Sequence, residues 1–121
     1  MPADPVARAS AGAQAESLAA AFLESRGLAI VARNVRSRFG EIDLIAKERD
    51  ILVFVEVRLR RSTRFGGASA SITAAKRDRL DAAAETYLAT LKRTPACRID
   101  AVLLDSLDPS RIEWLRDIAS A

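Results

Sequence analysis

The sequence predicts a single α/β domain whose mixed β-sheet carries helices on both faces. Segments in which apolar residues recur at helical spacing alternate along the chain with short runs rich in β-branched residues. The length of 121 residues suits one compact domain, and no internal repeat or low-complexity linker divides it. An order of helix, strands, helix and strand favours a mixed sheet covered on both faces. We therefore expect a loose tail over 1–6 and one domain over 7–121.

The first helix is expected from about 7 to 25, where alanine, leucine and phenylalanine recur at helical spacing and Gly27 follows as a stop signal. The next residues, 28–31, predict a short strand. The arginine-rich stretch 33–39 is expected to connect this strand to the next one.

Two further strands are separated by a polar turn. Residues 41–46 alternate polar and apolar side chains, and residues 51–57 are rich in β-branched and aromatic side chains, which predicts a central strand covered on both faces. Further along the chain we expect a loop over 62–70, a helix from the N-cap Thr73 to about Leu91, a strand over 99–104 and a last short element at 112–115.

The amino-acid composition excludes several classes of mechanism. The chain has no histidine and one cysteine. Ser-His-Asp hydrolases, histidine-dependent nucleases and zinc sites built from cysteine and histidine are therefore excluded. Carboxylate, lysine or arginine chemistry remains, and so does a site for a hard cation such as magnesium, which takes oxygen ligands.

Charge and hydropathy bear on location and partners. No uncharged apolar run approaches the roughly 20 residues of a membrane-spanning helix. The N-terminus has no basic flank followed by an apolar stretch, and a single cysteine agrees with a reducing compartment. We therefore expect a soluble cytoplasmic protein with no membrane partner. The net charge of +3 is distributed as arginine clusters around the candidate strands, which suits either a polyanion partner or an ordinary solvated surface.

Acidic residues fall on one face of the hairpin formed by the second and third strands. Because side chains alternate along a strand, Glu41 and Asp43 share a face of one strand, and Glu56 and Arg58 share a face of the other. Neighbouring carboxylates on a half-buried sheet repel each other unless a cation or a proton intervenes. A shared divalent ion would remove this repulsion and could activate water and polarise a phosphate. The alternative is that the acids face solvent and pair with nearby arginines.

The register of this hairpin depends on its turn. A two-residue turn at Arg49-Asp50 places Ile45 opposite Phe54, Asp43 opposite Glu56 and Glu41 opposite Arg58. A turn centred one residue earlier leaves Asp43 diagonal to Glu56 on the same face. Either register brings the two carboxylates within reach of a shared ion.

Several motifs follow one another in a fixed order. The chain contains Gly40-Glu41-Ile42-Asp43-Leu44-Ile45, Phe54-Val55-Glu56-Val57-Arg58, Arg64-Phe65-Gly66 and Lys76. In this order the motifs resemble the YraN-like family of small, uncharacterised bacterial proteins, over a span from the helix with Glu16 to the strand with Asp100. That family is similar to archaeal Holliday-junction resolvases and to the PD-(D/E)xK restriction-endonuclease-like nucleases. The resemblance implies a restriction-endonuclease-like α/β fold, with a central mixed β-sheet flanked by helices on both faces.

The resemblance also implies roles for single residues. Asp43 and Glu56 match the ligands of Mg²⁺ or Mn²⁺, with the main-chain carbonyl of Val57 as a further donor, and Glu16 matches an acid that resolvase-like members bring from the first helix. Arg58 stands where the pattern has a lysine, and arginine can stabilise phosphate charge but is a poor mimic of a lysine that activates water. The basic residues expected to contact nucleic acid are Arg60, Arg61, Arg64 and Lys76.

The function implied by this resemblance is that of a magnesium-dependent, endonuclease-like protein acting on DNA. Branched or otherwise structured DNA is a candidate substrate, and a homodimer is compatible with the resemblance. Arg58 in place of lysine leaves a catalytically inactive nucleic-acid-binding module of the same fold as the alternative. A protein-binding scaffold is not rejected by any residue, so the sequence leaves open whether the chain is an enzyme.

Overall fold

The computed structural model describes residues 10–59 and 72–118. Within these ranges the elements are α1 (Ala11–Ser25), β1 (Ala29–Ser37), β2 (Gly40–Glu48), β3 (Ile51–Leu59), α2 (Ala74–Leu88), β4 (Cys97–Leu104) and β5 (Ile112–Leu115). Neither of these two helices has the length and apolar character that crossing a membrane requires. The expected loop over 62–70 and the expected tail lie outside the described residues.

The strands form one sheet in the order β1-β2-β3-β4-β5. The pair β3–β4 is parallel and the other neighbouring pairs are antiparallel, so the sheet is mixed. A parallel pair needs a crossover connection, and α2 lies in the connection between β3 and β4. The central position of β3, which the sequence predicted, is confirmed.

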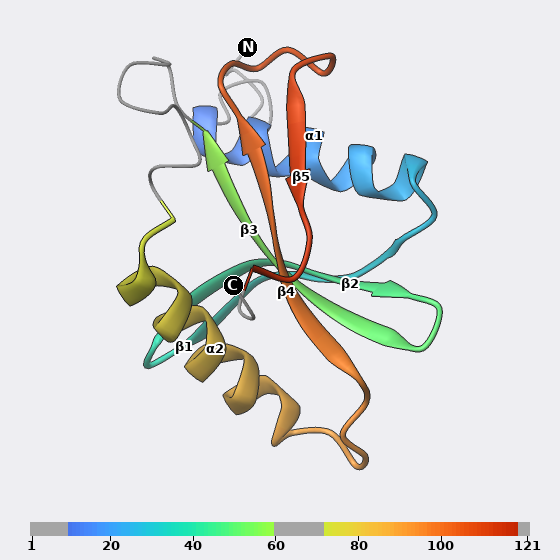
Figure 1. The fold of residues 1–121 in the computed structure, drawn as a ribbon, viewed down its shortest axis with the longest axis vertical. Coiled ribbons are helices and arrows are strands. Elements are labelled where there is room, and N and C mark those ends of the chain that lie inside the picture. Colours follow the sequence, from blue (N-terminus) through green and yellow to red (C-terminus); the bar gives the residue numbers. More distant parts are fainter. Residues whose placement is uncertain (1–9, 60–71, 119–121) are drawn as a thin grey trace, which may run out of the picture.

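Figure 1 shows α1 on one face of the sheet and α2 on the other. Val53 and Val55 of β3 pack in the buried cluster that contains the apolar residues of α1. Leu52 and Phe54, the alternate residues of the same strand, pack in the cluster that contains Leu80 of α2. A strand buried on both faces needs apolar side chains at successive positions, which explains the composition of β3. The layers confirm the predicted fold class and are consistent with a restriction-endonuclease-like fold.

Local signals in the sequence explain where the helices begin. The Ser10 hydroxyl accepts a hydrogen bond from the Ala13 amide (3.1 Å), and the Thr73 hydroxyl accepts one from the Lys76 amide (3.2 Å). Each bond satisfies an amide that has no partner inside its helix. The predicted N-cap Thr73 is therefore confirmed, although α2 ends at Leu88 rather than near Leu91.

The first strand is longer than the sequence predicted. Residues 33–37 belong to β1 and pair with β2 down to Ser37 and Gly40, so the expected connection is restricted to a tight turn. The pattern was misleading because β1 is an edge strand whose exposed side carries arginines, and an edge strand does not need a continuous apolar run. Gly40 closes the turn with φ of 124°, a conformation that other residues rarely adopt.

Asp100 of β4 is a buried carboxylate that connects several elements of the fold. It accepts hydrogen bonds from Arg98 Nε (3.0 Å), Trp114 Nε1 (2.9 Å) and the Asp117 amide (2.9 Å). Arg98 also donates to Glu48 (2.8 Å), which ties β4 to the end of β2. Several donors satisfy this buried charge, so Asp100 serves to join β4, β5 and the segment that follows β5.

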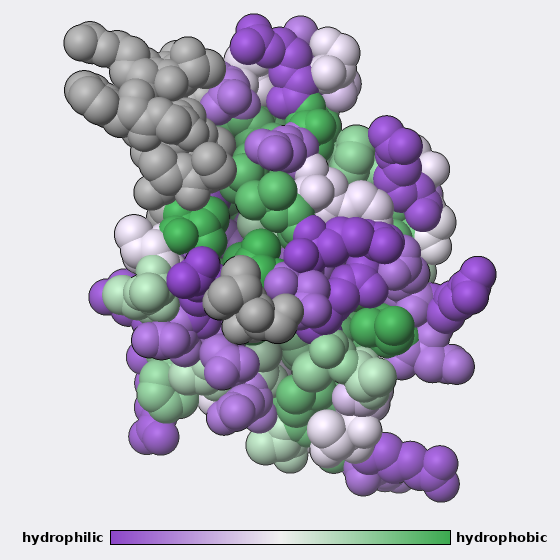
Figure 2. Space-filling view, viewed as in Figure 1, coloured by the Kyte–Doolittle hydropathy of each residue, from purple (hydrophilic) through white to green (hydrophobic). Residues whose placement is uncertain are grey.

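Hydrophilic side chains cover much of the face shown in Figure 2, and apolar residues are visible among them in smaller groups. Val31, Phe39, Leu91 and Leu107 are the large apolar residues that stay exposed in the described part of the chain. Single exposed apolar residues are common, so each is informative only through its surroundings.

Candidate active site

The candidate site begins where β2 separates from β3. The register has Ile45 opposite Phe54, as predicted for a turn at Arg49-Asp50, but the last pair of the ladder is Leu44 with Val55. Asp43 and Glu56 are therefore not a paired couple. Instead, the Asp43 carboxylate accepts a hydrogen bond from the Val57 amide (2.8 Å) and holds the two strands together through a side chain.

Three carboxylates converge beside this separation. Oxygens of Glu16 on α1 and of Glu41 and Asp43 on β2 all lie within 4.8 Å of one another. The Asn34 amide of β1, oriented with its nitrogen toward the acids, donates to Glu16 Oε1 (2.9 Å) and Glu41 Oε1 (2.6 Å). Asn34 has φ of 53°, a left-handed conformation that asparagine tolerates better than most residues. An irregular residue in an edge strand thus brings a polar group to the acids.

The electrostatics of this cluster favour uptake of positive charge. Burial, followed by the charges of Asp43 and Glu41, raises the pKa of Glu16 above its ordinary value. Burial also raises the pKa of Asp43, and the hydrogen bond from Val57 opposes that increase. Carboxylates gathered in this way are destabilising when all are ionised, and a proton or a cation would relieve the repulsion.

Glu56 lies beside the cluster and faces basic residues. Its side chain is only 4% exposed, and its Oε1 atom lies 3.4 Å from Lys76 Nζ and 3.6 Å from Arg58 Nη1. Burial, and then the charge of Asp43, raise the pKa of Glu56 to about 7, although the two basic residues oppose this shift. A carboxyl with a pKa near neutrality can accept or release a proton under physiological conditions. Asp100, the other buried carboxylate, differs from Glu56 in that its oxygens accept hydrogen bonds from donors at 2.9–3.2 Å.

The structure groups the predicted residues differently from the sequence. It brings Glu16 next to Asp43, as expected, but among the described residues the third carboxylate within ligand distance is Glu41 rather than Glu56. Glu56 is placed next to Lys76 and Arg58 and interacts electrostatically with Asp43. The predicted nucleic-acid contacts Arg60, Arg61 and Arg64 lie outside the described residues.

Two site residues were missed by the sequence reasoning. Strand alternation correctly placed Glu41 on the same face as Asp43, and this was the signal that could have identified it. The predicted register, however, placed Glu41 opposite Arg58. In the structure Glu41 Oε2 lies 3.5 Å from Arg36 Nε, and its other oxygen meets Asn34. Asn34 gave no signal, because 33–39 was expected to be a connection and its contacts depend on β1 pairing with β2.

Comparisons with known proteins identify the family to which the sequence is similar. The model of the uncharacterised protein family UPF0102 matches residues 15–104, a span that includes Glu16, Glu41, Asp43 and Glu56. The chain is 54% identical over 106 residues to a UPF0102 protein of Nitrosomonas europaea, covering 88% of this chain and 90% of that protein. It is 51% identical over 110 residues to one of Methylobacillus flagellatus, covering 91% and 96%. A relative from Cupriavidus metallidurans is 53% identical over 119 residues, covering 97% and 87%.

Proposed function

Within the uncharacterised protein family UPF0102, to which this chain belongs, we propose that it acts on DNA as a magnesium-dependent, endonuclease-like protein. The observation that carries the proposal is the convergence of Glu16, Glu41 and Asp43 beside the buried Glu56. Four carboxyl groups in one place are costly for folding alone, whereas a divalent cation would make the arrangement favourable. The resemblance to restriction-endonuclease-like nucleases supports the same reading.

The donor set fits a hard divalent cation. The oxygens of three acids lie within 4.8 Å of one another, so after a modest approach they could serve together as ligands of one ion. Glu16, Glu41 and Asp43 would hold the ion. When bound, such an ion polarises a phosphate and lowers the pKa of a bound water. The raised pKa of Glu56 suits it to accept a proton from an attacking water, a role in which a pKa near the working pH is most effective.

In the nuclease pattern one lysine both stabilises phosphate charge and helps to position water. Here two basic residues beside Glu56, Arg58 and Lys76, would share these functions. Arg58 is permanently charged and can bind a phosphate oxygen through its planar fork, but it cannot give up a proton. Lys76 supplies the amine, since its Nζ lies 3.4 Å from Glu56 Oε1 although it comes from α2 rather than from β3. The site therefore contains both a cation for the phosphate and an amine next to the acid. This arrangement supports catalysis despite the departure at Arg58.

The proposed partner is DNA, which the protein would meet in the cytoplasm of a bacterial cell. The charged groups of Arg58 and Lys76 lie beside Glu56, and the sequence that follows β3 contains three more arginines, at 60, 61 and 64. Basic residues beside an acidic centre suit a polyanion whose backbone must reach that centre.

Cation binding can be tested without any assay of cleavage. At a cation concentration about tenfold above Kd, mass action adds about 1.4 kcal/mol to stability, or roughly 5 °C in Tm for a domain of this size. Thermal unfolding with and without magnesium or manganese should show this increase, and Glu16→Gln should remove it. Glu113→Gln is a matched control, because Glu113 is an exposed acid on β5. An equal response in wild type and Glu16→Gln would exclude the proposed site.

A cleavage assay separates an enzyme from the alternative, a nucleic-acid-binding module without catalytic activity. The observation that favours this alternative is Arg58, an arginine at the position where the nuclease pattern has a lysine. Pure protein is incubated with linear, nicked and four-way-junction DNA, with and without magnesium or manganese. We expect metal-dependent cleavage that Lys76→Ala abolishes and that Arg58→Lys raises. If the protein binds DNA and cation but neither the wild type nor Arg58→Lys cuts any of these substrates, the binding module is the correct function.

A further inference from the structure

A hollow lies next to the candidate site, and most of the residues that line it have no role in the proposed chemistry. It lies between the β1–β2 turn and α2, has a cavity volume of about 80 Å³, and is lined by Phe39, Gly40, Glu41, Lys76, Arg79, Leu80 and Ala83. Pockets for whole small molecules start at roughly 300 Å³. This hollow is therefore large enough for part of a ligand that continues along the surface, such as one unit of a polymer.

The aromatic side of the hollow is Phe39, which is 36% exposed at the tip of a tight turn. The turn is fixed by Ser37, whose hydroxyl accepts from the Phe39 amide (3.1 Å) and donates to the Gly40 carbonyl (3.1 Å). The Arg38 guanidinium carbon lies 4.8 Å from the centre of the Phe39 ring. The guanidinium therefore lies against one face of the ring and helps to hold the ring in position. The exposed part of the phenylalanine provides a flat apolar surface on which a nucleobase can stack.

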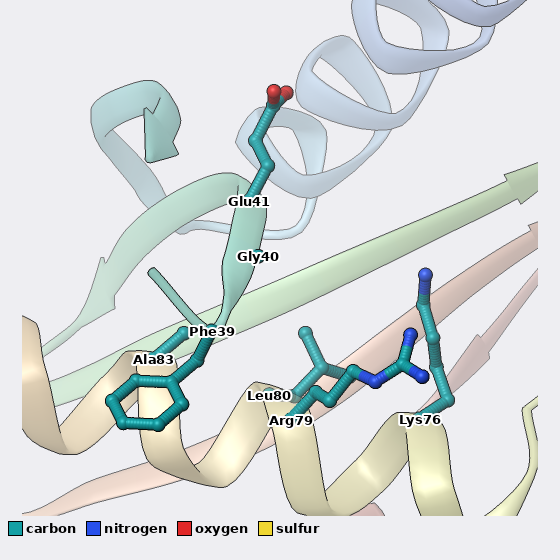
Figure 3. Close-up of a pocket in the computed structure, with 7 residues that line it drawn as sticks. All are labelled: Phe39, Gly40, Glu41, Lys76, Arg79, Leu80 and Ala83. Atoms are coloured by element: carbon teal, nitrogen blue, oxygen red, sulfur yellow. The ribbon is translucent and has the colours of Figure 1, made fainter. Parts of the chain in front are cut away.

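The other side of the hollow is basic. Lys76 and Arg79 lie three residues apart on α2 and therefore on the same side of the helix. Figure 3 shows Arg79 extending between Phe39 and Lys76, while the Glu41 side chain points away from Phe39 toward α1. A flat apolar ring next to two cations matches the two parts of a nucleotide, its base and its phosphate.

The hollow is continuous with the proposed active site through two shared residues. Lys76 lines the hollow and also lies 3.4 Å from Glu56 Oε1. Glu41 lines the hollow and also belongs to the group of acids proposed to bind the cation. A DNA strand whose phosphate reaches the acids would thus have its neighbouring nucleotide at Phe39.

We propose that this hollow is a subsite for an unpaired nucleotide, with the base stacked on Phe39 and the phosphate bound by Lys76 and Arg79. This inference rests on the proposed action on DNA and narrows its substrate class to DNA with an unpaired nucleotide next to the phosphate at the acids. A base in the interior of a duplex is stacked on both faces by its neighbours and cannot present a face to Phe39, whereas an unpaired base can. The subsite thereby selects tails, gaps and branch points over continuous duplex.

The test compares a fully paired duplex with a duplex that has a single-stranded tail carrying 2-aminopurine at the first unpaired position. Binding is measured with calcium in place of magnesium, through affinity and through the fluorescence of the 2-aminopurine, which stacking changes. The wild type should bind the tailed duplex more tightly than the paired one. Phe39→Ala should lower the affinity for the tailed duplex by about 5- to 150-fold, the range for loss of one base–aromatic stack, and leave the affinity for the paired duplex unchanged.

Further variants separate stacking from folding. Phe39→Leu keeps an apolar side chain against α2 and should still lose the preference for the tail, whereas Phe39→Trp should keep it. Leu91→Ala is a matched control, since Leu91 is also 36% exposed and lies beyond the opposite end of α2 from Lys76. Arg93→Ala is the corresponding control for Arg79→Ala, which should weaken binding of the tailed duplex.

The possible results separate this inference from the proposed function. If DNA and cation bind but Phe39→Ala weakens both duplexes equally, or neither, the subsite is excluded and the action on DNA stands. If neither duplex binds the wild-type protein, the action on DNA and the subsite fail together. A loss of the tail preference in Leu91→Ala would also overturn the assignment to Phe39.

Discussion

The protonation of Glu56 should make the stability of the metal-free protein depend on pH, and Glu56→Gln isolates this effect. The carboxyl has a pKa of about 7 in the folded protein and an ordinary value of 4.5, because burial and the charge of Asp43 disfavour ionisation. The folded state therefore binds this proton more tightly than the unfolded state does. The contribution to stability is fully present below pH 4.5 and is lost as the pH rises through about 7.

The size of the effect follows from the two pKa values. A difference of about 2.5 pKa units corresponds to about 3 kcal/mol at 1.36 kcal/mol per unit. Glutamine stays neutral at every pH and has nearly the same shape, so Glu56→Gln should keep this stability in alkaline solution. We expect the variant to exceed the wild type by up to about 3 kcal/mol at pH 8.5, and by much less at pH 4.5.

Urea unfolding at several pH values between 4.5 and 8.5, with EDTA present, measures the difference. Glu113→Gln provides the control, because an exposed acid should show little change in this comparison. A Glu56→Gln variant that is no more stable than the wild type at pH 8.5 would refute the reasoning. In that case Lys76 and Arg58 would offset the cost of burying the charge completely.

Other predictions concern the rest of the site and the framework. In metal-free protein at pH 8, Asn34→Asp should lower stability by about 1–3 kcal/mol, because a further acid replaces the donor to Glu16 and Glu41. Magnesium should then raise Tm more than it does in the wild type, and an unchanged magnesium response in thermal unfolding would contradict this. Asp100→Ala should lower the free energy of unfolding in urea by about 3–5 kcal/mol and leave the Tm response to magnesium intact. A loss of stability below about 1 kcal/mol would show that the hydrogen bonds of Asp100 are not needed to hold β4 and β5 together. Replacing Arg60 and Arg61 by alanine should weaken DNA binding. It should also reduce the slope of log Kd against log salt concentration by roughly one unit for each phosphate that the variant no longer binds. An unchanged slope would mean that both side chains only solvate the surface.

The sequence by itself determined the secondary structure that depends on local patterns. The helix N-cap at Thr73 and the buried central strand β3 follow from residues close together in the chain, whereas the structure decided between the two turn positions that the sequence left open, in favour of Arg49-Asp50. The physical reason is that capping and alternation involve neighbouring residues, so a short segment contains the whole signal. The sequence also identified Asp43, Glu56 and Glu16 as candidate site residues, through the motifs that carry the family resemblance.

The tertiary structure decided which of these acids meet. The β2–β3 ladder ends at Leu44 and Val55, so Asp43 bonds to the Val57 amide and lies with Glu16 and Glu41, while Glu56 faces Lys76. Alternation assumes a regular strand, and β1 and β2 depart from regularity at Asn34 and Gly40, where φ is positive. Whether such a departure is stable depends on contacts among α1, β1 and β2, which are distant in sequence. The grouping of charges at the site is therefore a property of the folded sheet and its two helices rather than of any one motif.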